Sequence, residues 1–165
     1  MKIGVDLGGT NVRAALVDDA NIIRIEKASC PAKGTQEEVI EAIAALIETL
    51  ICDEVTSIGI GVPSVVDTVK GIVYNVANIP SWQEVHLKEI FEKRFGIPVN
   101  VNNDANCFSL GESHFGQGRG YKDVVGITLG TGVGSGIIIN GHLYEGRNAG
   151  AGEIGCLSYL DKDYE

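Results

Sequence analysis

Three strand patterns in succession, followed by a helix and a further strand, constrain the fold of this chain more than any other feature. Apolar alternation predicts strands in 2–9, 11–19 and 21–30, and tight turns join these three strands into an antiparallel meander. Thr35 and Glu38 have the spacing of a capping box, and apolar residues follow at helical intervals to about residue 51. A strand at 57–63 then implies a βαβ crossover and parallel pairing with the meander. We therefore expect an α/β fold with a mixed sheet.

Beyond residue 63 the patterns divide the chain into a first domain and the beginning of a second. We expect a loop-rich stretch in 64–84, a helix in 85–95, a strand in 97–101 and a second helix in 105–115. Two strands linked by a glycine turn are expected in 123–132 and 135–146. The best linker candidate is Gly116–Gly120, in which three of five residues are glycine. A hairpin sheet without a covering helix is marginal alone. We expect one domain in 1–118 and the opening hairpins of a truncated second domain in 119–165.

Glycine is unusually frequent, with 22 among 165 residues against a usual share of roughly 7%. The excess lacks a period of three and proline is scarce, which excludes collagen, and 44% hydrophobic residues exclude global disorder. Many glycines fall in two segments that align with each other, 6–18 and 128–140, each predicted as strand, glycine-rich turn and strand. The likeness indicates two related domains, although glycine turns also resemble one another by coincidence. We attribute these glycines to ligand-binding turns, together with nearby Gly4 and Gly126 and the three glycines beside Glu153, which are Gly150, Gly152 and Gly155.

The net charge of −9 disfavours nucleic acid and anionic membranes as partners, because both require a basic face. No apolar run is long enough for a membrane span, and the first apolar run contains Asp6, so no secretory signal is predicted. The four cysteines form no C-x-x-C pair, which favours reduced thiols over a zinc cluster or disulfides. The expected location is the cytoplasm.

Two glycine turns are candidate phosphate sites. The first turn follows Asp6 and consists of Gly8, Gly9, Thr10 and Asn11. Its backbone N–H groups, the threonine hydroxyl and the asparagine amide could hold phosphate oxygens. Asp6 could bind Mg²⁺ through water. The second turn has Thr128, Gly130, Thr131 and Gly132. It lacks the G-x-G-x-x-G spacing and leads into a strand, so it is no dinucleotide fingerprint, and no Walker lysine occurs. An ordinary hairpin turn is the alternative for both.

Asp104 follows a strand, next to Asn102, Asn103 and Asn106. Ligands of open α/β sheets bind at the carboxyl ends of strands, and a carboxylate there can accept a proton from a substrate hydroxyl. The alternative is that Asp104 or Asn103 merely caps the next helix, but the clustered amides favour a hydroxyl-rich ligand.

Two further polar residues are candidates in loops, Asn78 and Glu153, although such residues are more often solvated. The three histidines have no ligand-like spacing.

Together and in order, these motifs resemble the ROK family of sugar kinases and their repressor relatives, within the actin-like, ribonuclease H-like ATPase fold. The motifs are DLGGTNVRAALVD, GIGVPSVVD, NVANIPSW, NNDAN, ITLGTGVGSGIIING and GAGEIG. The resemblance implies that Asp104 is the catalytic base. It implies that the two glycine turns bind ATP phosphates, and that the sugar contacts are Gly61, Asn78, Asn103 and Glu153.

Three positions depart from the family pattern. Ser64 and Ser81 stand where glycine is usual in the sugar loops, and Cys156 stands where a histidine commonly serves the sugar site and zinc. No cysteine cluster follows Cys156, so no zinc is expected. No helix-turn-helix precedes Met1, which disfavours a repressor.

The resulting prediction is an ATP- and Mg²⁺-dependent hexose kinase, glucokinase-like and acting at O6. Members of the family are roughly twice as long as this chain, so the isolated chain is expected to be inactive and to self-associate through the apolar face of 123–145. A homo-oligomer is expected for the protein itself. Two alternatives stay open: a non-catalytic sugar-sensing or regulatory module, and an actin-like ATPase that acts on something other than sugar.

Overall fold

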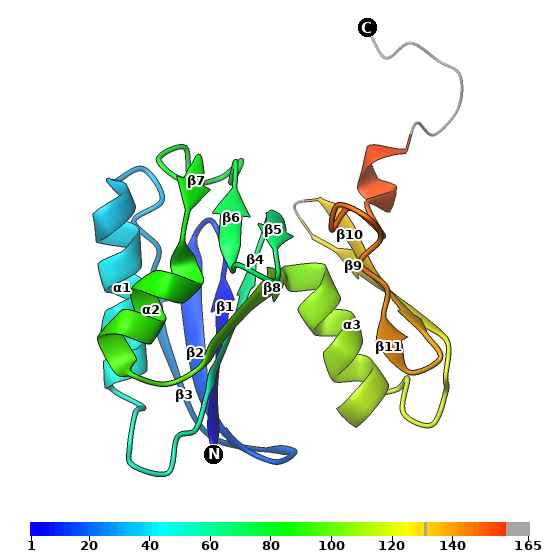
Figure 1. Ribbon diagram of the computed structural model, residues 1–165, viewed down its shortest axis with the longest axis horizontal. Coiled ribbons are helices and arrows are strands. Elements are labelled where there is room, and N and C mark those ends of the chain that lie inside the picture. Colours follow the sequence, from blue (N-terminus) through cyan, green and yellow to red (C-terminus); the bar gives the residue numbers. More distant parts are fainter. Residues whose placement is uncertain (131, 158–165) are drawn as a thin grey trace, which may run out of the picture. The chain divides into compact units, whose positions relative to one another are not determined.

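The computed structural model describes residues 1–130 and 132–157 and divides the chain into two compact units (Figure 1). The first unit is Met1–Asp104 and the second begins at Ala105. The division falls at the start of a helix, whereas the sequence placed the domain boundary after Gly118; that boundary stays a prediction. No helix in the described part of the chain has the length and apolar character to cross a membrane.

A five-stranded mixed sheet forms the centre of the first unit. Its strands, in spatial order, are β3 (Asn21–Ser29), β2 (Asn11–Asp18), β1 (Lys2–Leu7), β4 (Ile58–Val62) and β8 (Val99–Asn103). The first three pair antiparallel, and β1–β4 and β4–β8 pair parallel. The expected meander and βαβ crossover are therefore confirmed. A bulge between Leu16 and Val17 interrupts the β2–β3 register near the hairpin tip.

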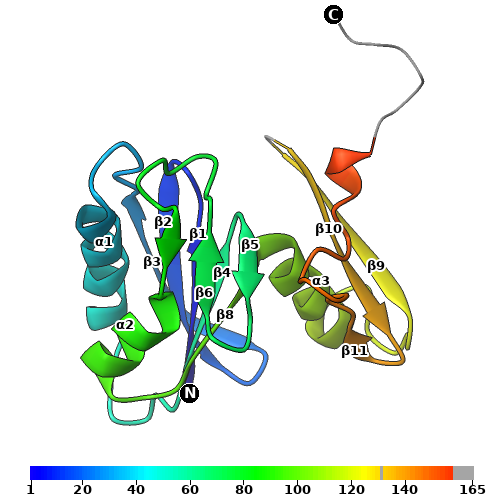
Figure 2. The ribbon, with the colours of Figure 1, turned by 45° about the horizontal axis from the view of Figure 1, so that its top comes forward.

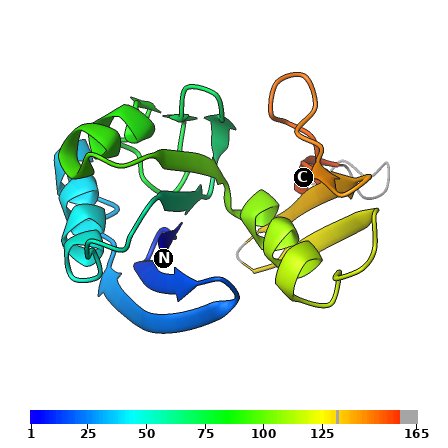
Figure 3. The ribbon, with the colours of Figure 1, turned by 60° about the horizontal axis from the view of Figure 1, so that its bottom comes forward.

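Two helices, α1 (Gln36–Glu48) and α2 (Leu87–Phe95), cover one face of this sheet (Figures 1 and 3). Alternate residues of β1 and β2 are buried, as the two-residue period of a strand requires when one face lies against a core. The helices contribute large side chains to that core, among them Ile43, Ile47 and Phe91, all fully buried.

Local sequence explains where α1 begins and where α2 ends. The Thr35 side chain accepts a hydrogen bond from the backbone of Glu38, and the Glu38 side chain accepts one from the backbone of Thr35, so the predicted capping box is confirmed. Gly96 ends α2 in the left-handed conformation, with φ of 69°, which glycine adopts without steric cost.

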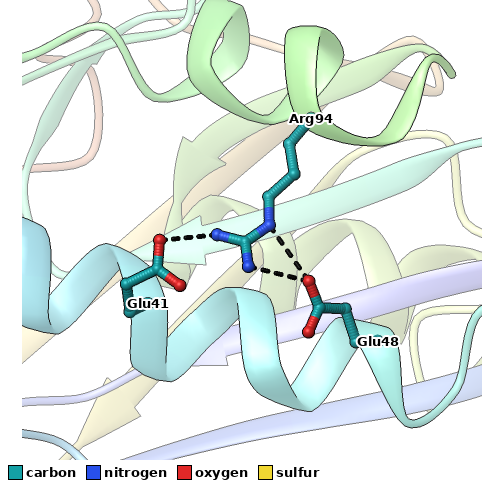
Figure 4. A network of polar contacts seen from close by, with 3 residues as sticks. All are labelled: Glu41, Glu48 and Arg94. Atoms are coloured by element: carbon teal, nitrogen blue, oxygen red, sulfur yellow. Dashed lines mark hydrogen bonds and ion pairs between the residues drawn. The ribbon is translucent and has the colours of Figure 1, made fainter.

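An ion-pair network joins the two helices at their exposed edge (Figure 4). The Arg94 guanidinium donates to Glu41 at 2.6 Å and to Glu48 at 2.7 Å. The hydrogen bond from Arg94 lowers the pKa of Glu41.

The stretch 64–84 contains more structure than the sequence predicted. It forms a small antiparallel sheet of β5 (Val65–Asp67), β6 (Ile72–Tyr74) and β7 (Glu84–Val85) (Figure 2). These strands have two or three residues each, too few for apolar alternation to be visible. The stretch is still mostly loop, as predicted, but the sequence did not reveal these three strands. Val66, Val73 and Val85 are buried and join the core of the unit.

The second unit packs one helix, α3 (Asp104–Phe115, from Ala105 onward), on a sheet of β9 (Val124–Leu129), β10 (Val133–Ile139) and β11 (His142–Leu143). A 3₁₀ helix, Ile154–Cys156, follows. The sheet meets the helix through glycines: a Cβ at Gly136 would lie 2.8 Å from the Ser109 Cβ and 2.9 Å from the Ala105 carbonyl oxygen. A Cβ at Gly126 would lie 3.0 Å from the Ser109 Cβ, and a Cβ at Gly134 would lie 3.0 Å from the Ala105 Cβ. The attribution of these three glycines to ligand turns was therefore wrong.

Candidate functional site

The first glycine turn lies between β1 and β2 and contacts the loop that carries Asn78. The Gly8 amide donates to the Asn11 carbonyl at 2.9 Å and closes the turn. A Cβ at Gly9 would lie 2.8 Å from the Asn78 Cβ, so only glycine permits this approach. Thr10 is exposed, and its carbonyl accepts from the Cys30 amide. The fold thus brings together a predicted phosphate turn and a predicted sugar contact that are far apart in sequence.

Asp6 lies two residues before this turn, at an exposed position on β1. Its carboxylate is 3.9 Å from the Arg13 guanidinium, and the two residues are cross-strand partners. Across the described residues, no group of three or more His, Cys, Asp or Glu side chains converges as a metal site. Mg²⁺ in phosphate-binding sites needs only one or two carboxylates, with waters and substrate phosphates as its other ligands. Exposed Asp6 beside a glycine turn fits that requirement.

The loop of Asn78 has a rigid frame although Asn78 itself is exposed. Backbone hydrogen bonds connect Asn75 to Gln83 and Val76 to Trp82, and a further pair closes the turn at Ile79. Ile79 and Trp82 are fully buried. Apolar anchors therefore fix the base of the loop and present Asn78 beside the glycine turn.

Asn103 and Asp104 lie at the carboxyl end of β8, where the sequence placed them. The parallel register sets Asn103 beside Val62 at the end of β4, and Asn102 beside buried Gly61. The Asn103 side-chain amide donates to the Ser64 carbonyl at 3.3 Å, and its backbone amide donates to the Asn102 side chain at 2.7 Å. Asp104 is half-buried and begins α3. The partial positive charge of a helix N-terminus favours a carboxylate there.

The remaining candidates lie in the second unit. Thr128 is half-buried on β9, and its hydroxyl is 2.8 Å from the position of a Cβ on Gly134. The Gly130 amide donates to the Gly132 carbonyl at 3.0 Å, which closes the turn; Thr131 lies outside the described residues. Glu153 is exposed immediately before the 3₁₀ helix. These geometries fit the predicted turn and loop positions, while the roles in binding remain predictions.

Sequence reasoning missed two hydroxyl groups that hold these loops. The Ser64 hydroxyl donates to the Tyr74 carbonyl, and the Ser135 hydroxyl donates to the Gly152 carbonyl at 2.5 Å, just before Glu153. Ser64 attracted notice only as a departure from the family pattern. Ser135 is buried at 4% exposure, and a lone serine in a glycine-rich strand gives no signal in the sequence.

Comparisons with known proteins agree with these motifs. A sequence profile of the ROK family matches residues 2–163, and the chain therefore belongs to the ROK family. The glucokinase of Streptomyces coelicolor is 42% identical over 159 residues, which are 95% of this chain and 49% of that protein. The glucokinase of Thermotoga maritima is 41% identical, with 93% of this chain and 49% of that protein covered. A putative xylose repressor of Caldicellulosiruptor is 34% identical, over 94% of this chain and 41% of that protein.

Solved structures give the same result for the fold. A ROK family glucokinase from Streptomyces griseus, in complex with glucose and AMPPNP, matches 96% of this chain and 51% of its own, with a TM-score of 0.88 and 40% identity. The ROK hexokinase of Thermus thermophilus matches 96% of this chain and 53% of its own, with a TM-score of 0.82 and 31% identity. The expected α/β, actin-like ATPase fold is thereby confirmed. The chain spans about half the length of the curated relatives it matches.

Proposed function

We propose that the protein is a sugar kinase that transfers the γ-phosphoryl group of ATP to a hexose hydroxyl, with O6 of a glucose-like sugar as the acceptor. The contact between the Gly9 turn and Asn78 carries this proposal, because it joins a phosphate-binding turn to a polar side chain suited to sugar hydroxyls. The relatives named glucokinase, and the solved glucokinase with glucose and AMPPNP, support the same assignment.

In the proposed reaction, Asp104 accepts the proton of the sugar hydroxyl while that oxygen attacks the γ-phosphorus. A new O–P bond forms and the bond to the ADP oxygen breaks. Gly61, Asn78 and Asn103 would orient the sugar, and the Gly8–Asn11 turn would hold phosphate oxygens. Mg²⁺, when bound with the nucleotide, neutralises phosphate charge. Asp6 is the residue that would hold it through water.

The second unit contributes the other proposed contacts. By resemblance, Thr128, Gly130, Thr131 and Gly132 bind ATP phosphates and Glu153 binds the sugar. The carbonyl that accepts from Ser135 belongs to Gly152, the residue before Glu153, so this hydrogen bond restrains the backbone that presents the carboxylate.

The decisive experiment replaces the proposed base. In the full-length protein, Asp104→Asn is expected to lower sugar-dependent ATP turnover by about 10²-fold or more, the lower range of general-base catalysis. Sugar binding measured by calorimetry should persist, because the amide keeps the size of the carboxyl group. Asp53→Asn, a substitution at an exposed position after α1, is the control. Turnover like that of the wild type in Asp104→Asn would reject the assignment.

A non-catalytic sugar sensor is the second candidate function, because a relative is named a putative xylose repressor and Cys156 is exposed where the kinases commonly have histidine. Calorimetry distinguishes the two: sugar binding without ATP turnover in the full-length wild type would support the sensor.

The 165-residue chain by itself is proposed to be inactive and to self-associate. Val125, Ile127 and Leu129 are 60%, 51% and 80% exposed on one face of β9, and such an apolar row favours association. A monomer by light scattering would contradict this part of the proposal.

A further inference from the structure

Ser64 occupies a junction between three segments of the first unit. It follows β4 and Pro63 and precedes β5. Its hydroxyl donates to the backbone carbonyl of Tyr74, the last residue of β6, and its own carbonyl accepts from the side-chain amide of Asn103 at the end of β8. Its backbone amide also donates to the Val62 carbonyl at 2.9 Å. The side chain and both backbone groups of this half-buried residue are therefore engaged.

The contact at Tyr74 matters because the chain changes direction there. Asn75 has a positive φ of 48°, a left-handed conformation that is uncommon outside glycine and that asparagine adopts more readily than most residues. From Asn75 the backbone enters the framed loop that presents Asn78 to the Gly9 turn. A hydrogen bond to the Tyr74 carbonyl thus fixes the point from which the Asn78 loop departs.

The contact at Asn103 acts on a second polar side chain. The hydrogen bond from the Asn103 amide nitrogen to the Ser64 carbonyl determines which way the amide faces, because its nitrogen only donates and its oxygen only accepts. A shift of the loop at Ser64 would therefore rotate or release Asn103. Ser64 is in this way connected both to Asn103 and to the departure point of the Asn78 loop.

We propose that Ser64 is a positioning residue for sugar binding, whose hydroxyl holds the loops of Asn78 and Asn103 in register with each other. The proposal rests on the proposed kinase function for the identity of the ligand. A glycine at this position has no hydroxyl to reach Tyr74, so this chain fixes the junction by a contact that the usual family residue does not make.

Three variants test the role in the full-length protein: Ser64→Ala, which removes the hydroxyl; Ser64→Thr, which keeps it; and Ser81→Ala as a matched control. Ser81 also replaces a family glycine and lies in the Asn78 loop, but within the described residues its buried hydroxyl has no hydrogen-bond partner. Sugar affinity is measured by calorimetry with glucose, and KM and kcat by coupled assay. Thermal unfolding of each variant shows that it is folded.

Ser64→Ala is expected to raise the dissociation constant and the KM for the sugar by about tenfold, the effect of losing one hydrogen bond and leaving its acceptor unsatisfied. The kcat should change less than about twofold, because the loops that this contact holds would bind the sugar equally in the ground state and the transition state. Ser64→Thr should restore most of the affinity, and Ser81→Ala should match the wild type.

A Ser64→Ala protein that unfolds at a lower temperature but binds glucose like the wild type would overturn the proposal, because the hydroxyl would then be structural only. An equal loss in Ser64→Thr, or in Ser81→Ala, would overturn it as well. The proposed function fails in a different way: the wild-type protein would itself bind or phosphorylate no sugar from a panel of hexoses.

Discussion

The two units bury a helix on a sheet by opposite means. In the first unit, α1 meets β1, β2 and β3 through large aliphatic side chains such as Ile43 and Ile47. In the second unit, α3 meets β9 and β10 through glycines on the strands and Ala105 and Ser109 on the helix. Large side chains fill the first interface, whereas in the second the backbones of helix and strands lie in direct contact. We therefore expect smaller side chains to destabilise the first interface and larger ones to destabilise the second.

The largest effect is expected from removing volume in the first interface. Ile43→Ala should lower the free energy of unfolding by about 2–5 kcal/mol, because it leaves a cavity at a fully buried position. Trp82 is the single tryptophan of the chain and is fully buried in the same unit, so its fluorescence in a urea titration of the 165-residue chain reports this loss. Ala20→Gly, in the exposed β2–β3 turn, is a volume-reducing control. A change below about 1 kcal/mol for Ile43→Ala would break the comparison, because the first interface would then not depend on volume.

Adding a single methyl group should be enough to destabilise the second interface. Gly136→Ala is expected to destabilise the second unit by about 1–3 kcal/mol, because its Cβ would lie 2.6 Å from the Ser109 hydroxyl and 2.9 Å from the Ala105 carbonyl. Faster amide hydrogen exchange in β9, β10 and α3 measures the effect, since this unit contains no tryptophan. The matched control is Gly59→Ala on β4, where the added methyl group meets nothing within 4 Å. Equal exchange in the two variants would show that the close approach carries no energetic weight.

The same contrast explains which parts of the structure could be predicted from the sequence. Large apolar residues at helical spacing, with Thr35 and Glu38 ahead of them, define α1, and its predicted start is confirmed. The glycines of β9 and β10 carry no such information, because a glycine in a ligand turn and a glycine under a helix look identical in a sequence. Gly126, Gly134 and Gly136 were misassigned for that reason, while Gly9 proved to permit a contact at the candidate site.

Some parts of the candidate site could likewise be predicted from the sequence, and others could not. Asn103 and Asp104 could be placed at the end of a strand, because the pattern before them is a buried strand and ligands gather at such ends. The contact between Gly9 and Asn78 could not be predicted, since it depends on a loop held by backbone hydrogen bonds over Ile79 and Trp82. The hydroxyl contacts of Ser64 and Ser135 arise from tertiary structure in the same way.

The smallest effect concerns the exposed ion-pair network between α1 and α2, in which Arg94 contacts Glu41 and Glu48. The Arg94 hydrogen bond lowers the pKa of Glu41 in the folded protein, so the ionised carboxylate stabilises the fold above the unfolded pKa of Glu41. That contribution is lost as the pH falls through the lowered, folded pKa. Arg94→Met removes the network, so the wild type and this variant should differ slightly in stability at neutral pH and converge in acid.

The measurement is the urea midpoint of Trp82 fluorescence for both proteins, taken at neutral pH and at several points below the normal pKa of a glutamate. A control substitution, Lys93→Met, removes a positive charge from an exposed neighbouring position on the same helix and should give no comparable convergence. A difference between the wild type and Arg94→Met that stayed constant in acid would contradict this prediction, because the ionised carboxylate of Glu41 would then not be its source.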